Sequence, residues 1–217
     1  MIQTNPINVI TFLTLLSLIP IIVIMTTCFV KVSMVLLITR ESLGVQQIPP
    51  NMVIYCLSLI LTFYIMGPVY KNTMNTASVA LSNDNVTMTT MLTGFKQSSA
   101  SITRFLDKNT PSASKDFFYN SLKKFWTPDM MKDIKQNDLI VLIPAFLVSE
   151  MTRAFRIGFL IYLPSVIIDI IVSNLLMAMG MMMMSPVTIS LPIKLLLFVS
   201  LDGWAKIVTA LMGSYVR

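Results

Sequence analysis

The chain has 217 residues, of which 55% are hydrophobic and 12% charged, and its mean hydropathy of +0.76 is typical of membrane proteins. Its net charge of +6 comes from basic residues that are spread along the chain, which argues against a nucleic-acid partner. The absence of His removes the commonest general base and the commonest metal ligand.

Other catalytic chemistry also finds no support in the sequence. There is no Gly-rich phosphate loop, and no Ser or Cys stands beside a plausible base. Cys28 and Cys56 both lie in apolar stretches, where a free Cys behaves as a small hydrophobe. We therefore expect a protein that is not an enzyme and that has no cofactor and no metal site.

Residues 1–70 are predicted to form a hydrophobic helical hairpin. The stretches 7–30 and 52–70 carry no charge over lengths that suit a bilayer span of roughly 20 residues. Pro20 predicts a kink in the first arm. No charge precedes Lys31, so this arm does not resemble a cleaved signal peptide, and we expect it to stay.

The turn of this hairpin is predicted from its breakers and its charges. Gly44 indicates a helix stop, Pro49 and Pro50 an extended turn, and Gly67-Pro68 the end of the second arm. Lys31 and Arg40 lie in the short connection between the two arms, which by the positive-inside rule places it in the cytoplasm.

Residues 71–138 have the composition of a soluble protein, and we expect a polar, periplasmic insert. Asn72 to Thr93 lacks periodicity and is predicted to be a loop. Ser114 to Trp126 is predicted to form an amphipathic helix that ends before Pro128.

Residues 139–217 are predicted to form a second hairpin, which is too polar to face lipid on all sides. A charge in the middle of a membrane costs about 2.5–3.5 kcal/mol on insertion scales, so charged residues there normally face protein or water. The polar residues in question are Glu150, Arg153, Arg156, Asp169, Asn174, Lys194, Asp202 and Lys206.

These polar residues allow two interpretations. Glu150 with Arg153, and Asp202 with Lys206, have the spacing of helical side-chain pairs, which favours a role in the register between helices or subunits. Alternatively, Glu150, Asp169, Lys194 and Asp202 form an ion or proton relay. The register interpretation needs no further function and is favoured.

Six of the eight residues from 177 to 184 are methionines, and Ser185-Pro186 follows, which indicates a helix end or a turn. They are Met177, Met179, Met181, Met182, Met183 and Met184. Three interpretations are open: core filler with Met177, Met181 and Met184 on one helical face, Cu(I) ligands, or a soft seal made by several copies. The residues alone favour core filler, and copper is disfavoured because no second soft-ligand cluster occurs.

Ordered motifs along nearly the whole chain resemble the FliP/SctR family, the R component of type III secretion export apparatuses. In the front half they are the stretches 28–31, 43–51 and 66–69, and in the back half 144–150, 154–159, 168–169, the methionine run, 185–192 with Lys194, and 202–204. The Gln-Gln-Ile-Pro-Pro-Asn stretch at 46–51 is more similar to the injectisome branch than to the flagellar one.

The resemblance implies an all-α fold of two long kinked hairpins with a small polar helical insert, assembled as a helical oligomeric pore. It implies a pentamer with the S and T proteins in the bacterial inner membrane, contacts with the U and V proteins and with the base of the rod and needle, and unfolded secreted proteins as the transported substrate. It further implies that Met177 to Met184 are a gasket in that pore, and it argues against four simple membrane spans. The alternative is a small-ion or Cu(I) transporter.

Overall fold

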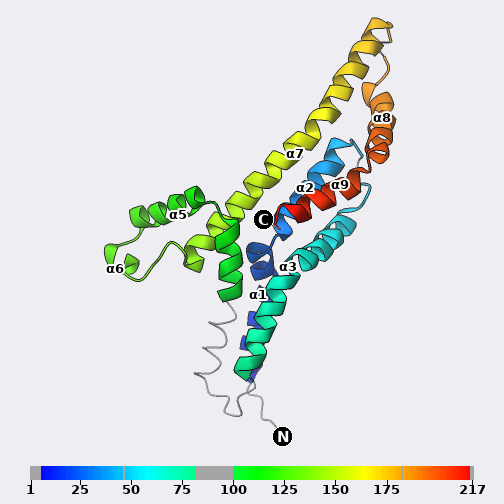
Figure 1. Cartoon of the computed structure of the whole chain (residues 1–217). Coiled ribbons are helices and arrows are strands. Elements are labelled where there is room, and N and C mark those ends of the chain that lie inside the picture. Colours follow the sequence, from blue (N-terminus) through cyan, green and yellow to red (C-terminus); the bar gives the residue numbers. More distant parts are fainter. Residues whose placement is uncertain (1–5, 46, 82–99, 182, 216–217) are drawn as a thin grey trace. The chain divides into compact units, whose positions relative to one another are not determined.

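The computed structural model of the chain describes residues 6–45, 47–81, 100–181 and 183–215, and these residues form helices and no strand (Figure 1). This confirms the all-α prediction. The helices are α1 (Pro6–Thr26), α2 (Phe29–Ser42), α3 (Asn51–Leu81), a helical stretch at residues 100–109, α5 (Ser112–Phe125), α6 (Pro128–Met131), α7 (Leu139–Ala178), α8 (Pro186–Ser200) and α9 (Gly203–Gly213).

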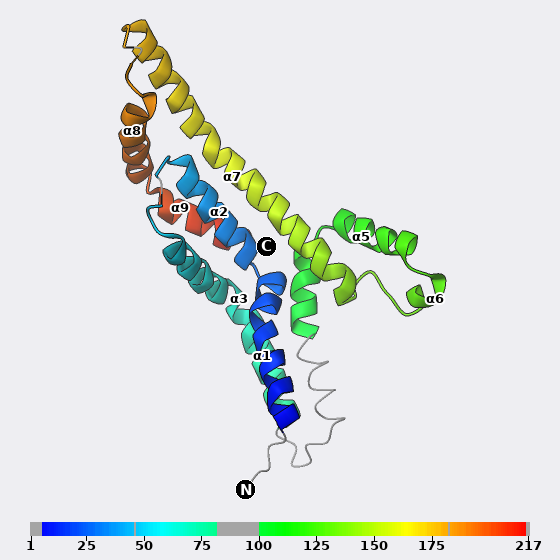
Figure 2. The same cartoon turned by 180° about the vertical axis from the view of Figure 1, so that it is seen from behind.

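The helices divide into two compact units, and the long helices α3 and α7 contribute to both (Figure 2). Unit 1 comprises Met1–Val30 and Val69–Leu147, and unit 2 comprises Lys31–Pro68 and Val148–Arg217. The two units are defined by contacts between residues. The sequence-based division into 1–70, 71–138 and 139–217 was defined by composition instead, and it stays a prediction.

Unit 1 is held together by a small apolar core. Leu106, Leu142 and Phe146 are almost completely buried, and the ring of Phe105 packs edge-on against Phe146 with centroids 5.8 Å apart. Lys115 Nζ of α5 lies 2.5 Å from the Asp107 carboxylate, which ties α5 to the helical stretch before it. The amphipathic helix expected before Pro128 is confirmed as α5, which ends at Phe125.

Two expectations about helix ends are wrong. The helix α1 ends at Thr26, whereas the first arm was expected to run to Val30. Gly67-Pro68 does not end α3, which continues to Leu81, and a proline removes only one backbone hydrogen bond from a helix. Residues 72–81 of the expected loop are therefore helical, and 82–93 lie outside the described residues.

Unit 2 packs α2 against α7 at short range. Gly158 of α7 lies against Ile38 of α2 so closely that a Cβ added there would be 2.6 Å from Ile38 Cδ1. Further along, the Ser165 hydroxyl donates to the backbone carbonyl of Ser42. A small residue is what lets two helices approach in this way.

The turn between α2 and α3 is also built inside unit 2. Gly44 has φ +74°, a left-handed conformation that favours glycine, and α2 ends just before it as predicted. Arg40 Nη1 donates to Asn51 Oδ1 at 2.5 Å and to the Pro49 carbonyl at 3.2 Å. Lys31 and Arg40 are thus buried helical residues of α2, and the positive-inside argument, which placed them in a solvated connection, loses its basis.

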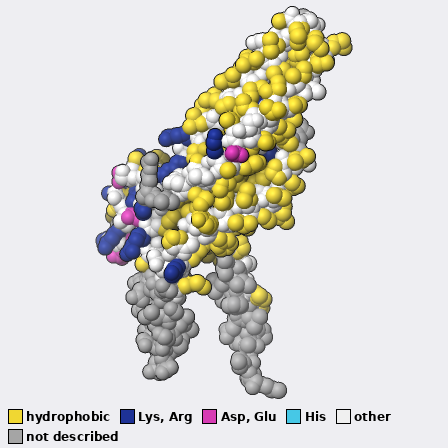
Figure 3. All heavy atoms as spheres, turned by 45° about the vertical axis from the view of Figure 1, so that its right-hand side comes forward, with side chains coloured by type: hydrophobic (Ala, Val, Ile, Leu, Met, Phe, Trp, Pro, Cys, Tyr) yellow, Lys and Arg dark blue, Asp and Glu magenta, His cyan; other side chains and the backbone are white. Residues whose placement is uncertain are grey.

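Two helices are long and apolar enough to cross a membrane, namely Asn51–Met74 and Leu139–Ala178, and up to four spans result if each bent pair of shorter helices counts as one. One such pair is α8 with α9, which meet at 59°. In the space-filling view, hydrophobic side chains cover most of the visible surface, and charged side chains gather over the α5–α6 segment (Figure 3).

Candidate functional site

The methionine run forms the connection between α7 and α8. The helix α7 ends at Ala178 with Gly180 at φ +72°, and the Met181 amide donates to the Leu176 carbonyl at 2.9 Å. The Gly180 amide donates to the Met177 carbonyl at 3.0 Å. This pair of hydrogen bonds around a left-handed glycine is a Schellman motif, which ends a helix and turns the chain sharply. The helix end predicted from the sequence is confirmed.

The methionine side chains of this loop are open to solvent within the single chain. The five described ones range from 39% exposed at Met181 to 102% at Met183, and Met182 lies outside the described residues. A hollow of about 610 Å³ at the loop is lined by Gly180, Met181, Met183, Met184 and Ser185. The core-filler interpretation is therefore wrong, because the helix ends before Met181 and Met184 can share a face with Met177.

An ion pair joins the two helices that carry the loop. Lys194 Nζ of α8 lies 2.6 Å from Asp169 Oδ2 of α7, and the lysine is largely buried while the aspartate is partly exposed. Each residue lies roughly 13 Å from the loop, at about 1.5 Å of helix per residue. This Asp169–Lys194 ion pair, called the clasp below, thus links the two helices that flank the methionine loop.

A second group of charges is buried around Glu150 of α7. Glu150 and Lys31 are each only 1% exposed, and Lys31 Nζ lies 3.2 Å from Glu150 Oε2. Arg153 Nη1 approaches the other carboxylate oxygen at 2.7 Å, as the i, i+3 spacing predicted. The Tyr215 hydroxyl also donates to Glu150 Oε2, and its ring lies 3.6 Å from Lys31 Nζ.

Sequence reasoning missed Lys31 and Tyr215 as members of this group. Lys31 is the first charge of the chain and stands in an apolar stretch, which is a signal for a buried partner. No comparable signal marks Tyr215, because a partner so distant in sequence can be found only once the chain is folded.

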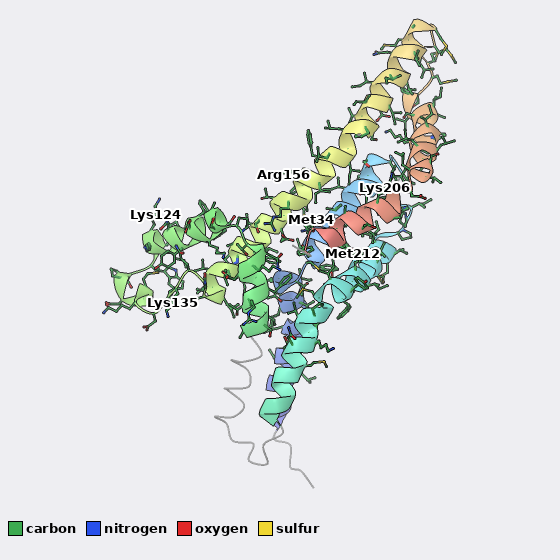
Figure 4. The ribbon with its side chains drawn as sticks, in the orientation of Figure 1. Met34, Lys124, Lys135, Arg156, Lys206 and Met212 are labelled. Atoms are coloured by element: carbon green, nitrogen blue, oxygen red, sulfur yellow. The ribbon has the colours of Figure 1, made fainter. Side chains whose placement is uncertain are left out.

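The remaining predicted site residues are exposed. Arg156, Asn174, Asp202 and Lys206 all have exposed side chains, and Figure 4 shows Arg156 on α7 and Lys206 on α9. Asp202 and Lys206 are joined through the backbone, at 3.1 Å from the Lys206 amide to the Asp202 carbonyl. Their role in register stays a prediction about the assembled protein.

The arrangement does not favour a relay through the charges. Glu150 and Asp169 lie on one helix, roughly 28 Å apart at about 1.5 Å per residue, and each is paired with a neighbour of its own. Among the described residues, no three or more His, Cys, Asp or Glu side chains are grouped so that they could hold a metal ion.

Comparison with known proteins identifies the family. The FliP family model matches residues 12–211. The chain is 46% identical to Yop proteins translocation protein R of Yersinia pestis over 214 residues, which cover 97% of each protein. It is 43% identical to virulence protein YscR of Salmonella typhimurium, with 97% of each covered, and 41% identical to harpin secretion protein HrcR of Erwinia amylovora, with 99% and 98% covered.

These relatives cover nearly the full length of the chain, so the match is not confined to one segment. The chain belongs to the FliP family, in the branch of the secretion proteins YscR and HrcR, and is a non-enzymatic component of a type III export apparatus.

Proposed function

We propose that the protein is a core subunit of the export gate and that several copies, together with the S and T proteins, enclose a pore for unfolded secreted proteins. By family resemblance, the homo-oligomer is a pentamer in the inner membrane, near the U and V proteins and below the rod and needle. The polar insert then lies on the periplasmic side. In this gate, the loop Met177 to Met184 seals the closed channel.

The exposure of the loop methionines is the observation that carries this proposal. Apolar side chains so exposed at the end of a long apolar helix pair are unfavourable in water and need a cover. The described part of a single chain leaves these side chains exposed, whereas several identical loops that converge would cover one another. Because a thioether side chain is unbranched and has three rotatable bonds, such a seal deforms around a passing chain and closes again.

The Asp169–Lys194 clasp gives the seal its position. A soft loop makes a reproducible ring only if each copy presents it at the same height and angle. The partly buried, hydrogen-bonded pair between α7 and α8 restricts how these helices slide past one another. In this proposal the methionine side chains make the seal deformable, and the Asp169–Lys194 ion pair fixes the position of the loop.

The seal is tested by replacing Met181 to Met184 with Ala. With these thioethers gone, the assembled complex should leak ions in a planar bilayer while secretion continues. The matched control replaces Met52, Met74 and Met130, which are also exposed but lie on α3 and α6. Unchanged ion conductance of the loop variant in an intact complex would refute the proposed sealing role of the methionines.

Replacing the same four residues with Leu separates softness from apolarity. Leucine keeps the apolar volume but is branched, so it packs less adaptably than methionine. We expect the Leu variant to stay closed to ions and to secrete more slowly. If it secretes at the normal rate, the methionines seal through apolar area alone.

The clasp is tested with Asp169→Asn and Lys194→Ala, each of which should lower the recovery of the complex with the S and T proteins. Normal recovery with lost secretion would instead support a relay through these residues.

The side of the insert is tested with Asn120→Cys, at an exposed position of α5, in a Cys56→Ser background. A maleimide that cannot cross the inner membrane should label this thiol in cells whose outer membrane is permeable. Labelling only after cell lysis would place the insert in the cytoplasm.

A further inference from the structure

The charged residues of unit 2 that the structure describes are matched within the chain with three exceptions. Lys31 and Arg153 pair with Glu150, Lys194 pairs with Asp169, and Arg40 pairs with Glu41. Among the described residues of unit 2, Asp202 is the acidic side chain without an ion pair, and Arg156 and Lys206 are the basic ones. An unmatched carboxylate and an unmatched guanidinium thus occur on the surface of one apolar unit.

Arg156 lies within an apolar surface of α7. Its exposed neighbours Phe155, Phe159 and Leu160 are all more than half accessible. Such a surface is buried in an assembly or a membrane, and a guanidinium buried with it requires an anionic partner. The planar guanidinium of arginine fits a carboxylate through two parallel hydrogen bonds.

Asp202 lies within an equally apolar surface, at the turn between α8 and α9. Val199 and Leu201 are exposed next to it, and Trp204 is more than a third accessible. Both surfaces are thus apolar, and Asp202 at the turn is opposite in charge to Arg156 on α7.

The turn holds Asp202 firmly while leaving its carboxylate free. Its backbone has φ +51°, and the side chain makes no capping hydrogen bond to α9. A Cβ on the next residue, Gly203, would lie 2.3 Å from the ring of Phe198, which packs edge-on against Trp204. The turn is therefore closely packed at Gly203, and the Asp202 carboxylate makes no capping hydrogen bond to its own helix.

We propose that Asp202 of one copy receives Arg156 of the next copy, with the apolar surfaces around both residues packed together. This inference rests on the proposed multi-copy gate. The two surfaces are different parts of the same chain, so the contact is head-to-tail, and repeating it generates a ring or a helix of copies.

A charge exchange tests the pair. Arg156→Glu and Asp202→Arg should each lower the recovery of the multi-copy complex several-fold, because each places like charges together in an apolar contact. The double exchange in one chain should restore recovery. A double variant that assembles no better than the singles would overturn the pairing.

A cross-linking experiment does not depend on disruptive charges. One copy carries Arg156→Cys and a differently tagged copy carries Asp202→Cys, both in a Cys56→Ser background. A short bismaleimide then spans the distance that the arginine side chain would cover. We expect a covalent dimer with both tags. The control replaces Asp202→Cys with Glu41→Cys, which presents the other well-exposed acidic position of unit 2.

The outcomes separate this inference from the proposed function. An intact complex with no cross-link, or with equal cross-linking through Glu41→Cys, overturns the Arg156–Asp202 contact and leaves the gate standing. A wild-type protein that does not associate with further copies even when the S and T proteins are present overturns the proposed function itself.

Discussion

The buried group around Glu150 should be highly sensitive to the loss of one charge. Lys31→Met removes an ammonium that lies 3.2 Å from Glu150 Oε2 and leaves the carboxylate 1% exposed. Removing one partner of a buried ion pair typically costs about 3–5 kcal/mol. Arg153 and the Tyr215 hydroxyl still contact Glu150, so we expect a loss of about 3 kcal/mol in the free energy of unfolding, at the low end of that range.

The second half of the prediction concerns the double variant Lys31→Met with Glu150→Gln. The amide oxygen of the new glutamine side chain can accept from Arg153 while its NH2 group donates to the Tyr215 hydroxyl oxygen, and no unpaired carboxylate remains in the interior. Replacing both members of a buried pair is often close to neutral, so the double variant should lie within about 1 kcal/mol of the wild type. The two substitutions should therefore be strongly non-additive.

The assay is the unfolding of the purified full chain in mild detergent by added dodecyl sulfate, followed by the fluorescence of Trp126 and Trp204. Lys206→Met serves as the matched control, because it removes an exposed lysine of the same unit and should change stability by less than about 0.5 kcal/mol. A loss below about 1 kcal/mol for Lys31→Met, or a double variant that loses the sum of both singles, would refute the reasoning.

Three further predictions use the same titration. Gly158→Leu should destabilise unit 2 by about 1–3 kcal/mol, since even a Cβ would meet Ile38 at 2.6 Å, and an unchanged midpoint would show that α2 and α7 can separate at no cost. Gly180→Ala should cost about 1–2 kcal/mol because φ is +72°, whereas Gly67→Ala, in the interior of α3 with open space around it, should be neutral or stabilising by about 0.5–1 kcal/mol. Equal effects at the two glycines would contradict this conformational explanation. Tyr215→Phe keeps the ring near the buried ammonium but removes the hydroxyl, and should cost about 1–3 kcal/mol; a smaller loss would mean that the hydroxyl bond to Glu150 adds little.

Features that depend on a few neighbouring residues were predictable. The helix stop at Gly44, the end of α5 near Trp126 and the helix end within the methionine run all follow from backbone preferences of the residues concerned. The pairing of Glu150 with Arg153 also follows, because three residues on a helix bring two side chains together whatever the fold.

A proline was one source of error in the helix boundaries. Pro68 lies inside α3, although Gly67-Pro68 was expected to end that helix, whereas the kink expected at Pro20 stays a prediction. A proline costs a helix one hydrogen bond and a steric adjustment, and the helix continues where other interactions outweigh that cost. That balance depends on what the helix packs against, which the local sequence does not contain.

At the candidate site, the properties of single residues and their near neighbours predict some features but not others. An apolar, helical, non-enzymatic chain with a soft methionine loop at a helix end is already determined by composition and order, because these properties come from each residue's own side chain and its near neighbours. The burial of Lys31 against Glu150 and Tyr215, the clasp of Asp169 with Lys194 and the exposure of the methionines were decided only by the tertiary structure. Each joins or separates residues far apart in the sequence, and the cost of a buried charge or an exposed apolar side chain depends on the partner that folding brings to it.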